Sequence, residues 1–97
     1  MAIDISKLTA VQTASCEQAG RKAIDAFLLD EEREYWFNYT CEGCSEQFLK
    51  NLMLGLGCQI VIGKKRPDAR FCMDFVKYFA KNFMHRAEEA PVAALIH

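Results

Sequence analysis

The chain has 97 residues, of which 52% are hydrophobic, and 12 basic against 13 acidic residues leave a net charge of −1. This length suits one domain with a modest core, and so small a net charge offers no overall attraction for nucleic acid. The hydrophobic share exceeds the roughly 45–50% of an average domain even when glycine is counted there, so we expect a self-associated or partner-bound protein.

The first predicted helix covers residues 6–29, with Asp4 or Ser6 as its N-terminal cap. One face has mostly small residues at helical spacing, namely Leu8, Val11, Ser15, Ala19, Ala23, Ala26 and Phe27. Gly20 lies within this helix, where glycine costs about 1 kcal/mol relative to alanine. We therefore expect either local fraying or a tight helix contact at Gly20.

Residues 31–40 carry two conflicting signals. Several acidic residues come after Asp30, as in the first turn of a helix. The aromatic residues between Tyr35 and Thr40 favour a strand instead. The acidic start and the lack of an obvious partner strand lead us to expect a second helix here.

A third helix is predicted over residues 45–57, beginning at the N-cap Ser45 and ending at Gly55 or Gly57. The next apolar stretch, residues 58–62, either continues this helix or forms a short strand. The pattern does not decide between the two.

The last predicted helix starts at Pro67 and Asp68 and runs to about Glu89. Its polar residues fall in a narrow stripe, which leaves an apolar arc of about 240° where a surface helix needs little more than about 100°. A helix of this kind is buried on more than one side.

These elements predict an all-α fold of about four helices, with a possible short strand near 58–62, forming one protein-interaction domain over residues 1–97. The apolar arc and an aromatic cluster in the second helix are more than so short a chain easily buries, and aromatic residues are enriched at interface centres. The candidates for a partner or dimer interface are Trp36, Phe37, Phe71, Phe75, Val76, Phe79, Phe83 and Met84.

The pair Cys41 and Cys44 has two functional interpretations. A strand leading to C-x-x-C at a helix N-terminus resembles a thioredoxin-like site, where the helix dipole favours the first thiolate. Too few residues remain for the rest of that fold, and Glu42-Gly43 departs from the Gly-Pro of thioredoxins. A thiol-disulfide oxidoreductase therefore stays an alternative to two cysteines that pack a helix junction.

Zinc is the second alternative for the same pair. A structural zinc site needs four ligands, commonly two close pairs, and Cys41 and Cys44 would have to be joined by Cys58 and Cys72, which stand alone in the sequence. A zinc-stabilised adaptor is thus less favoured than a chain without metal or other cofactor.

Catalysis and nucleic-acid binding find little support. The chain has no nucleophile elbow and no phosphate loop, and both histidines, His85 and His97, lie near its end. The basic residues between Lys64 and Arg70 are interrupted by Asp68 and have a counterpart in the acidic run that begins at Asp30. Two solvated connections are the favoured interpretation of these runs, and complementary patches across a dimer or a partner are the alternative. We expect neither an enzyme nor a binder of nucleic acid or small-molecule substrates.

The N-terminus lacks the basic and apolar regions of a secretory signal, and no apolar run reaches the 18 or so residues that span a bilayer. Five cysteines without a framework spacing indicate reduced thiols. We therefore expect a cytoplasmic regulator that forms a homodimer and acts by protein–protein contact. An antiactivator that occupies the hydrophobic dimer surface of a transcription factor or an enzyme is the class expected.

Overall fold

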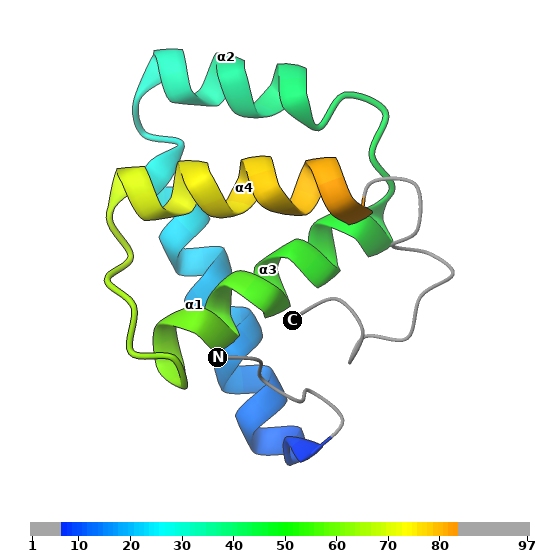
Figure 1. Cartoon of the computed structure of the whole chain (residues 1–97), viewed down its shortest axis with the longest axis vertical. Coiled ribbons are helices and arrows are strands. Elements are labelled where there is room, and N and C mark those ends of the chain that lie inside the picture. The colour runs from blue at the N-terminus through cyan, green and yellow to red at the C-terminus, as the bar shows by residue number, and fades with distance from the viewer. Residues whose placement is uncertain (1–6, 84–97) are drawn as a thin grey trace.

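The computed structural model describes residues 7–83, which form four helices joined by short connections (Figure 1). The helices are α1 (Ala10–Phe27), α2 (Glu31–Thr40), α3 (Glu46–Val61) and α4 (Ala69–Phe83). The predicted all-α fold with about four helices is confirmed. The described part contains no strand, because residues 58–61 form the last turn of α3 and Ile62 is its C-cap.

A reciprocal cap begins α1. The Thr9 hydroxyl accepts a hydrogen bond from the backbone N–H of Gln12 at 3.1 Å, and the Gln12 side-chain oxygen accepts from the N–H of Thr9 at 2.9 Å. This capping box satisfies two N–H groups that have no partner inside the helix. The helix therefore starts later than the predicted residue 6, and the expected caps Asp4 and Ser6 lie outside the described residues.

Polar side chains also begin the other three helices. Asp30 accepts from the N–H groups of Glu32 and Arg33 at 3.0 and 3.1 Å, which fixes residues 31–40 as a helix despite their aromatic content. Ser45 caps α3 as predicted, and the Asp68 carboxylate accepts a backbone N–H in the first turn of α4. In α2, the Asp30 cap and the packing of Phe37 and Trp36 on the core stabilise a helix despite the β propensity of its aromatic residues.

Two glycines let α1 and α3 cross at close range. A Cβ atom on Gly20 would overlap the carbonyl oxygen of Met53, and one on Gly57 would overlap that of Cys16. The tight contact expected at Gly20 is thus present. Gly57 does not end its helix as predicted; it lies inside α3, at the point where α1 leaves no room for a side chain.

The buried face of α1 differs from the predicted one by part of a turn. It consists of Cys16, Gly20, Ala23, Ile24 and Phe27. Val11 and Ala26, which the spacing places on the buried face, are exposed. The reason is that the backbone contact with α3 centres on Gly20, and a glycine carries no signal on a hydrophobicity pattern.

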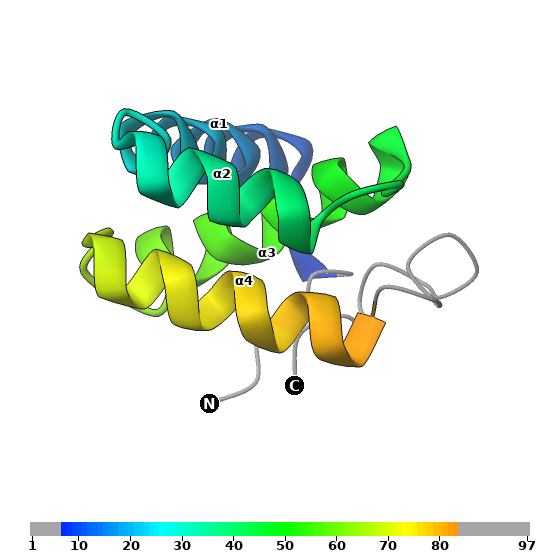
Figure 2. The ribbon, with the colours of Figure 1, turned by 90° about the horizontal axis from the view of Figure 1, so that it is seen from above.

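The position of α4 explains its wide apolar arc. α4 contacts each of the other three helices, and it lies between α2 and α3 in Figure 1 and on the opposite side of α3 from α1 in Figure 2. The largest fully buried apolar side chains come from α1, α3 and α4 and are Ile24, Phe48, Leu52, Leu56, Val76 and Phe79. α4 thus buries Cys72, Val76, Phe79 and Ala80 against its own chain, and the flanking Phe71, Met73 and Phe75 are half-buried.

The described part of α4 ends at Phe83, so its predicted extension to Glu89 lies outside the described residues. Among residues 7–83, no helix has both the length and the apolar character that crossing a bilayer requires. The longest helix, α1, has 18 residues and exposes polar side chains on much of its circumference.

Candidate interaction surface

Three residues predicted for an interface belong to the core of the single chain. Phe37, Val76 and Phe79 are buried within the single chain, and the Phe79 ring packs edge-on against that of Phe48 with 5.1 Å between centroids. A partner could reach these side chains only after α2 or α4 had been displaced, and their part in an interface stays a prediction. Aromatic residues at helical spacing are typical of cores and of interfaces alike.

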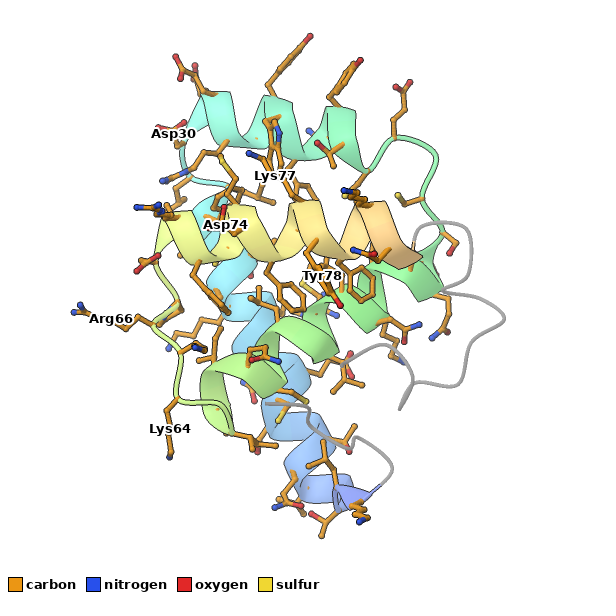
Figure 3. The ribbon with its side chains drawn as sticks, viewed as in Figure 1. Asp30, Lys64, Arg66, Asp74, Lys77 and Tyr78 are labelled. Carbon is orange, nitrogen blue, oxygen red and sulfur yellow. The ribbon has the colours of Figure 1, made fainter. Side chains whose placement is uncertain are left out.

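Trp36, another predicted interface residue, is half-buried and holds α2 against its neighbours. Its ring meets that of Phe27 edge-on at 6.1 Å. From the other side the Lys77 ammonium lies 5.9 Å from the centre of the indole ring, and Figure 3 shows Lys77 extending from α4 towards α2. These contacts tie α2 to α1 and α4, which is a structural role.

The remaining predicted interface residues lie on α4 or beyond it. Phe71 and Phe75 are half-buried, with 6.3 Å between their ring centroids, and Phe75 stacks on the buried Phe79 at 6.0 Å. Both residues pack at the edge of the core, and part of each ring is accessible to solvent. The side chain of Phe83 and the whole of Met84 lie outside the described residues.

Cys41 and Cys44 come together in a tight turn between α2 and α3. The N–H of Cys44 donates to the carbonyl oxygen of Cys41 at 3.0 Å, and Gly43 supplies the left-handed φ of 75° that the turn requires. The Cys41 thiol hydrogen-bonds to the Cys44 sulfur. The prediction of a helix junction with Gly43 at its turn describes this geometry.

The surroundings of the pair disfavour a reactive thiolate. Burial, reinforced by Cys44, raises the pKa of Cys41 from 9.0 to about 12, and burial raises the pKa of Cys44 as well. Cys41 is also the C-cap of α2, the end of a helix where negative charge is unfavourable. A thioredoxin-like nucleophile needs the opposite arrangement, so this geometry gives no support to the oxidoreductase alternative.

The other cysteines do not complete a metal site. Within residues 7–83, no group of three or more histidine, cysteine or acidic side chains is placed to hold a metal ion. Cys58 instead lies beside Cys16 in the α1–α3 crossing, where burial raises the pKa of Cys58 to about 12. Cys72 is buried on α4, with Asp68 and Arg33 as its charged neighbours. The set of four cysteines considered for zinc is therefore distributed over separate places.

The outer face of α2 carries two exposed tyrosines that are absent from the predicted interface residues. Tyr35 and Tyr39 are four residues apart, so they lie side by side on one face of the helix, and they are 75% and 73% exposed. Acidic side chains surround them along the same exposed helix and the turn after it, namely Glu31, Glu32, Glu34 and Glu42. We call this surface the α2 face.

Several contacts anchor the inner side of α2, opposite the α2 face. The Arg33 side chain points inward, where its Nε–H donates to the carbonyl oxygen of Phe27 at 2.9 Å and its guanidinium lies 5.2 Å from the centre of the Phe27 ring. Phe37 and Trp36 anchor the same inner side. With the one basic residue of α2 turned inward, the outer side presents tyrosine and carboxylate.

Other exposed apolar side chains of the described chain are dispersed rather than clustered in one helix. They are Val11 near the start of α1, Leu29 in the α1–α2 turn, Val61 at the end of α3 and Tyr78 on α4. Single exposed apolar residues are normal on a protein surface. The adjacent tyrosines of α2 therefore stand apart from them.

A separate basic surface lies on the connection between α3 and α4. Lys64, Lys65 and Arg66 are exposed there, and Arg70 lies in the first turn of α4. Figure 3 shows Lys64 and Arg66 extending outward from the same edge of the molecule that carries Asp30 at its upper end. Acidic and basic surfaces thus occupy different places on one chain.

Comparison with known proteins provides no relative: no protein family, no curated protein and no solved structure matches the chain. Its function is therefore inferred from its own residues. Among the described residues, the α2 face is where two exposed aromatic side chains lie next to each other.

Proposed function

We propose that the chain is a small protein-interaction domain that regulates a partner protein by occupying an apolar surface of it, with the α2 face as the contact surface. The observation that carries the proposal is the pair Tyr35 and Tyr39, adjacent and about three-quarters exposed on a helix whose inner side is anchored. Tyrosine is among the residues that contribute most to binding at interface centres.

The area available on the α2 face fits a contact of moderate size. A buried aromatic side chain contributes about 150–250 Å², so two tyrosines with about three-quarters of that area exposed offer roughly 200–400 Å². A standard interface buries about 800 Å² per partner. The tyrosine pair would supply a quarter to a half of it, and the rest comes from the polar rim.

The charges around the tyrosines indicate the chemistry of the partner. Glu31, Glu34 and Glu42 give the rim a negative potential, which is complementary to an apolar patch bordered by lysine or arginine. Such complementarity raises the association rate and makes it fall as salt increases. A regulator built in this way acts by occupancy, as an antagonist of whatever else that surface binds, such as the dimer surface of a transcription factor or an enzyme.

Affinity enrichment from the native cell extract tests the proposal with three baits: the unchanged protein, Tyr35→Ser combined with Tyr39→Ser, and Val11→Ser. All three should have the same helical circular dichroism, because substitutions at exposed positions usually change stability by no more than about 0.5 kcal/mol. The proposal expects a protein that is retained by the unchanged bait and the Val11 variant and lost from the tyrosine variant. Equal retention of every protein by all three baits would contradict it.

A further inference from the structure

The edge of the molecule between the α1–α2 turn and the basic connection carries an exposed side chain and a pocket next to it. Leu29, in the α1–α2 turn, is 84% exposed, the highest value among the large apolar residues of the described chain. A pocket of about 200 Å³ lies beside this turn. Neither feature belongs to the α2 face, because Leu29 precedes α2 and the pocket lies on its inner side.

Four of the five residues that line the pocket are apolar. They are Ala26, Phe27, Pro67 and Ala69, and Arg33 is the polar member. Arg33 donates its Nε–H to the carbonyl oxygen of Phe27 and lies over the Phe27 ring, so its guanidinium is held against the Phe27 side of the lining. An aliphatic side chain that enters the pocket can pack against the four apolar residues.

Leu29 cannot enter the pocket of its own chain, because its exposure shows that it extends into solvent. A protruding side chain and a matching pocket on the same edge are the elements of a self-complementary interface. A two-fold axis between them places each Leu29 in the pocket of the other copy, so that both contacts form at once.

The charges along the edge favour the same arrangement. Asp30 and Glu31 lie at one end of the edge, beside Leu29, and Lys64 and Arg66 lie at the other, as Figure 3 shows for Asp30, Lys64 and Arg66. Within residues 7–83, the basic side chains of this connection form no ion pair with their own chain. A two-fold rotation brings the acidic end of each copy opposite the basic end of the other, and parallel stacking would bring like charges together.

We infer that this edge is the interface of a symmetric dimer, with a second copy of the chain as the occupant of the pocket. Leu29 enters the pocket formed by Phe27, Pro67 and their neighbours, and the acidic start of α2 faces the basic connection of the other copy. Tyr35 and Tyr39 of the α2 face stay accessible in this dimer, so two partner-binding surfaces are presented together.

Sedimentation equilibrium over a range of protein concentrations tests the dimer. The unchanged protein should show a monomer–dimer equilibrium whose Kd rises with salt. Leu29→Ala should raise the Kd at least about tenfold, since it removes three carbons from the buried contact, and Leu29→Glu should leave a monomer. Val11→Glu, at the opposite end of α1, is the matched control and should dimerise like the unchanged protein.

A charge exchange tests the orientation of the two copies. Glu31→Arg alone and Arg66→Glu alone should each raise the Kd, and the two together should restore it to within about threefold of the original value. A protein that remains monomeric at millimolar concentration, or a dimer indifferent to Leu29→Glu, overturns the inference. So does a double variant weaker than either single one. Glu31 also belongs to the rim of the α2 face, so the test of that face uses Tyr35 and Tyr39, which all of these variants leave unchanged.

Discussion

Replacing Gly57 with alanine should destabilise the protein, although alanine is the better helix former. A Cβ atom at this position would overlap the carbonyl oxygen of Cys16 and lie 3.0 Å from the backbone nitrogen of Gly20. Both are backbone atoms of α1, which cannot rotate out of the way as a side chain would. The two helices must therefore move apart.

The size of the effect depends on two opposing contributions. In a helix without neighbours the change would stabilise by about 1 kcal/mol. Here the oxygen and the new carbon must separate towards an ordinary distance of about 3.5 Å, which loosens the packing of Leu52 and Leu56 in the core. Overpacking of this kind costs about 1–3 kcal/mol and sometimes more. Because the overlapping atoms belong to the backbone, we take the upper end of that cost, about 3 kcal/mol, and subtract the gain of about 1 kcal/mol, so we expect a net loss of about 2 kcal/mol in the free energy of unfolding.

Urea denaturation monitored by circular dichroism measures this loss. Gly20→Ala should behave similarly, and the double variant should lose less than the sum of the two, because the first substitution already separates the helices. Ala14→Gly, at an exposed position of α1, calibrates helix propensity and should cost about 1 kcal/mol. A Gly57→Ala protein more stable than the unchanged one would refute the close crossing.

Three further predictions concern Phe79 and the cysteine pair. Phe79→Ala should cost about 3–5 kcal/mol in a urea titration, where an interface role for Phe79 predicts little change. Cys41→Ser combined with Cys44→Ser should leave binding at the α2 face intact, and its loss would revive the dithiol as the functional centre. The pKa of Cys41 is raised from 9.0 to about 12 by folding, so the protonated thiol favours the folded state. This contribution to the free energy of unfolding is present below pH 9 and is lost as pH rises towards about 12. Alkylation of Cys41 at neutral pH should accordingly be at least about tenfold slower than that of the urea-unfolded chain.

The sequence predicted the helices better than it predicted their faces. Asp30 and Ser45 are local signals, since a cap contacts backbone two or three residues away, and both helix starts were predicted correctly. Gly20 and Gly57 depend on each other across the fold. Taken alone, Gly57 is a typical helix end, and only the position of α1 shows why α3 continues through it.

The same distinction applies to the candidate surface. Phe79 and Tyr39 are both aromatic residues in helices, and the sequence does not reveal that one is enclosed while the other is 73% exposed. The difference arises because α4 lies between α2 and α3, whereas α2 covers only one side of α4 (Figure 1). A clue was available in the sequence: the tyrosines lie among carboxylates along α2, but the phenylalanines of α4 adjoin Cys72 and Val76.

Site-specific photo-crosslinking tests most directly whether the α2 face is the binding surface. The protein, carrying benzoylphenylalanine in place of Tyr39 or, as a control, Val11, is irradiated in the native cell extract. We expect a crosslinked partner from position 39 that is absent from position 11 and that diminishes as salt is raised. Crosslinks from position 11 without any from position 39 would contradict the proposal and place the contact surface elsewhere on the chain.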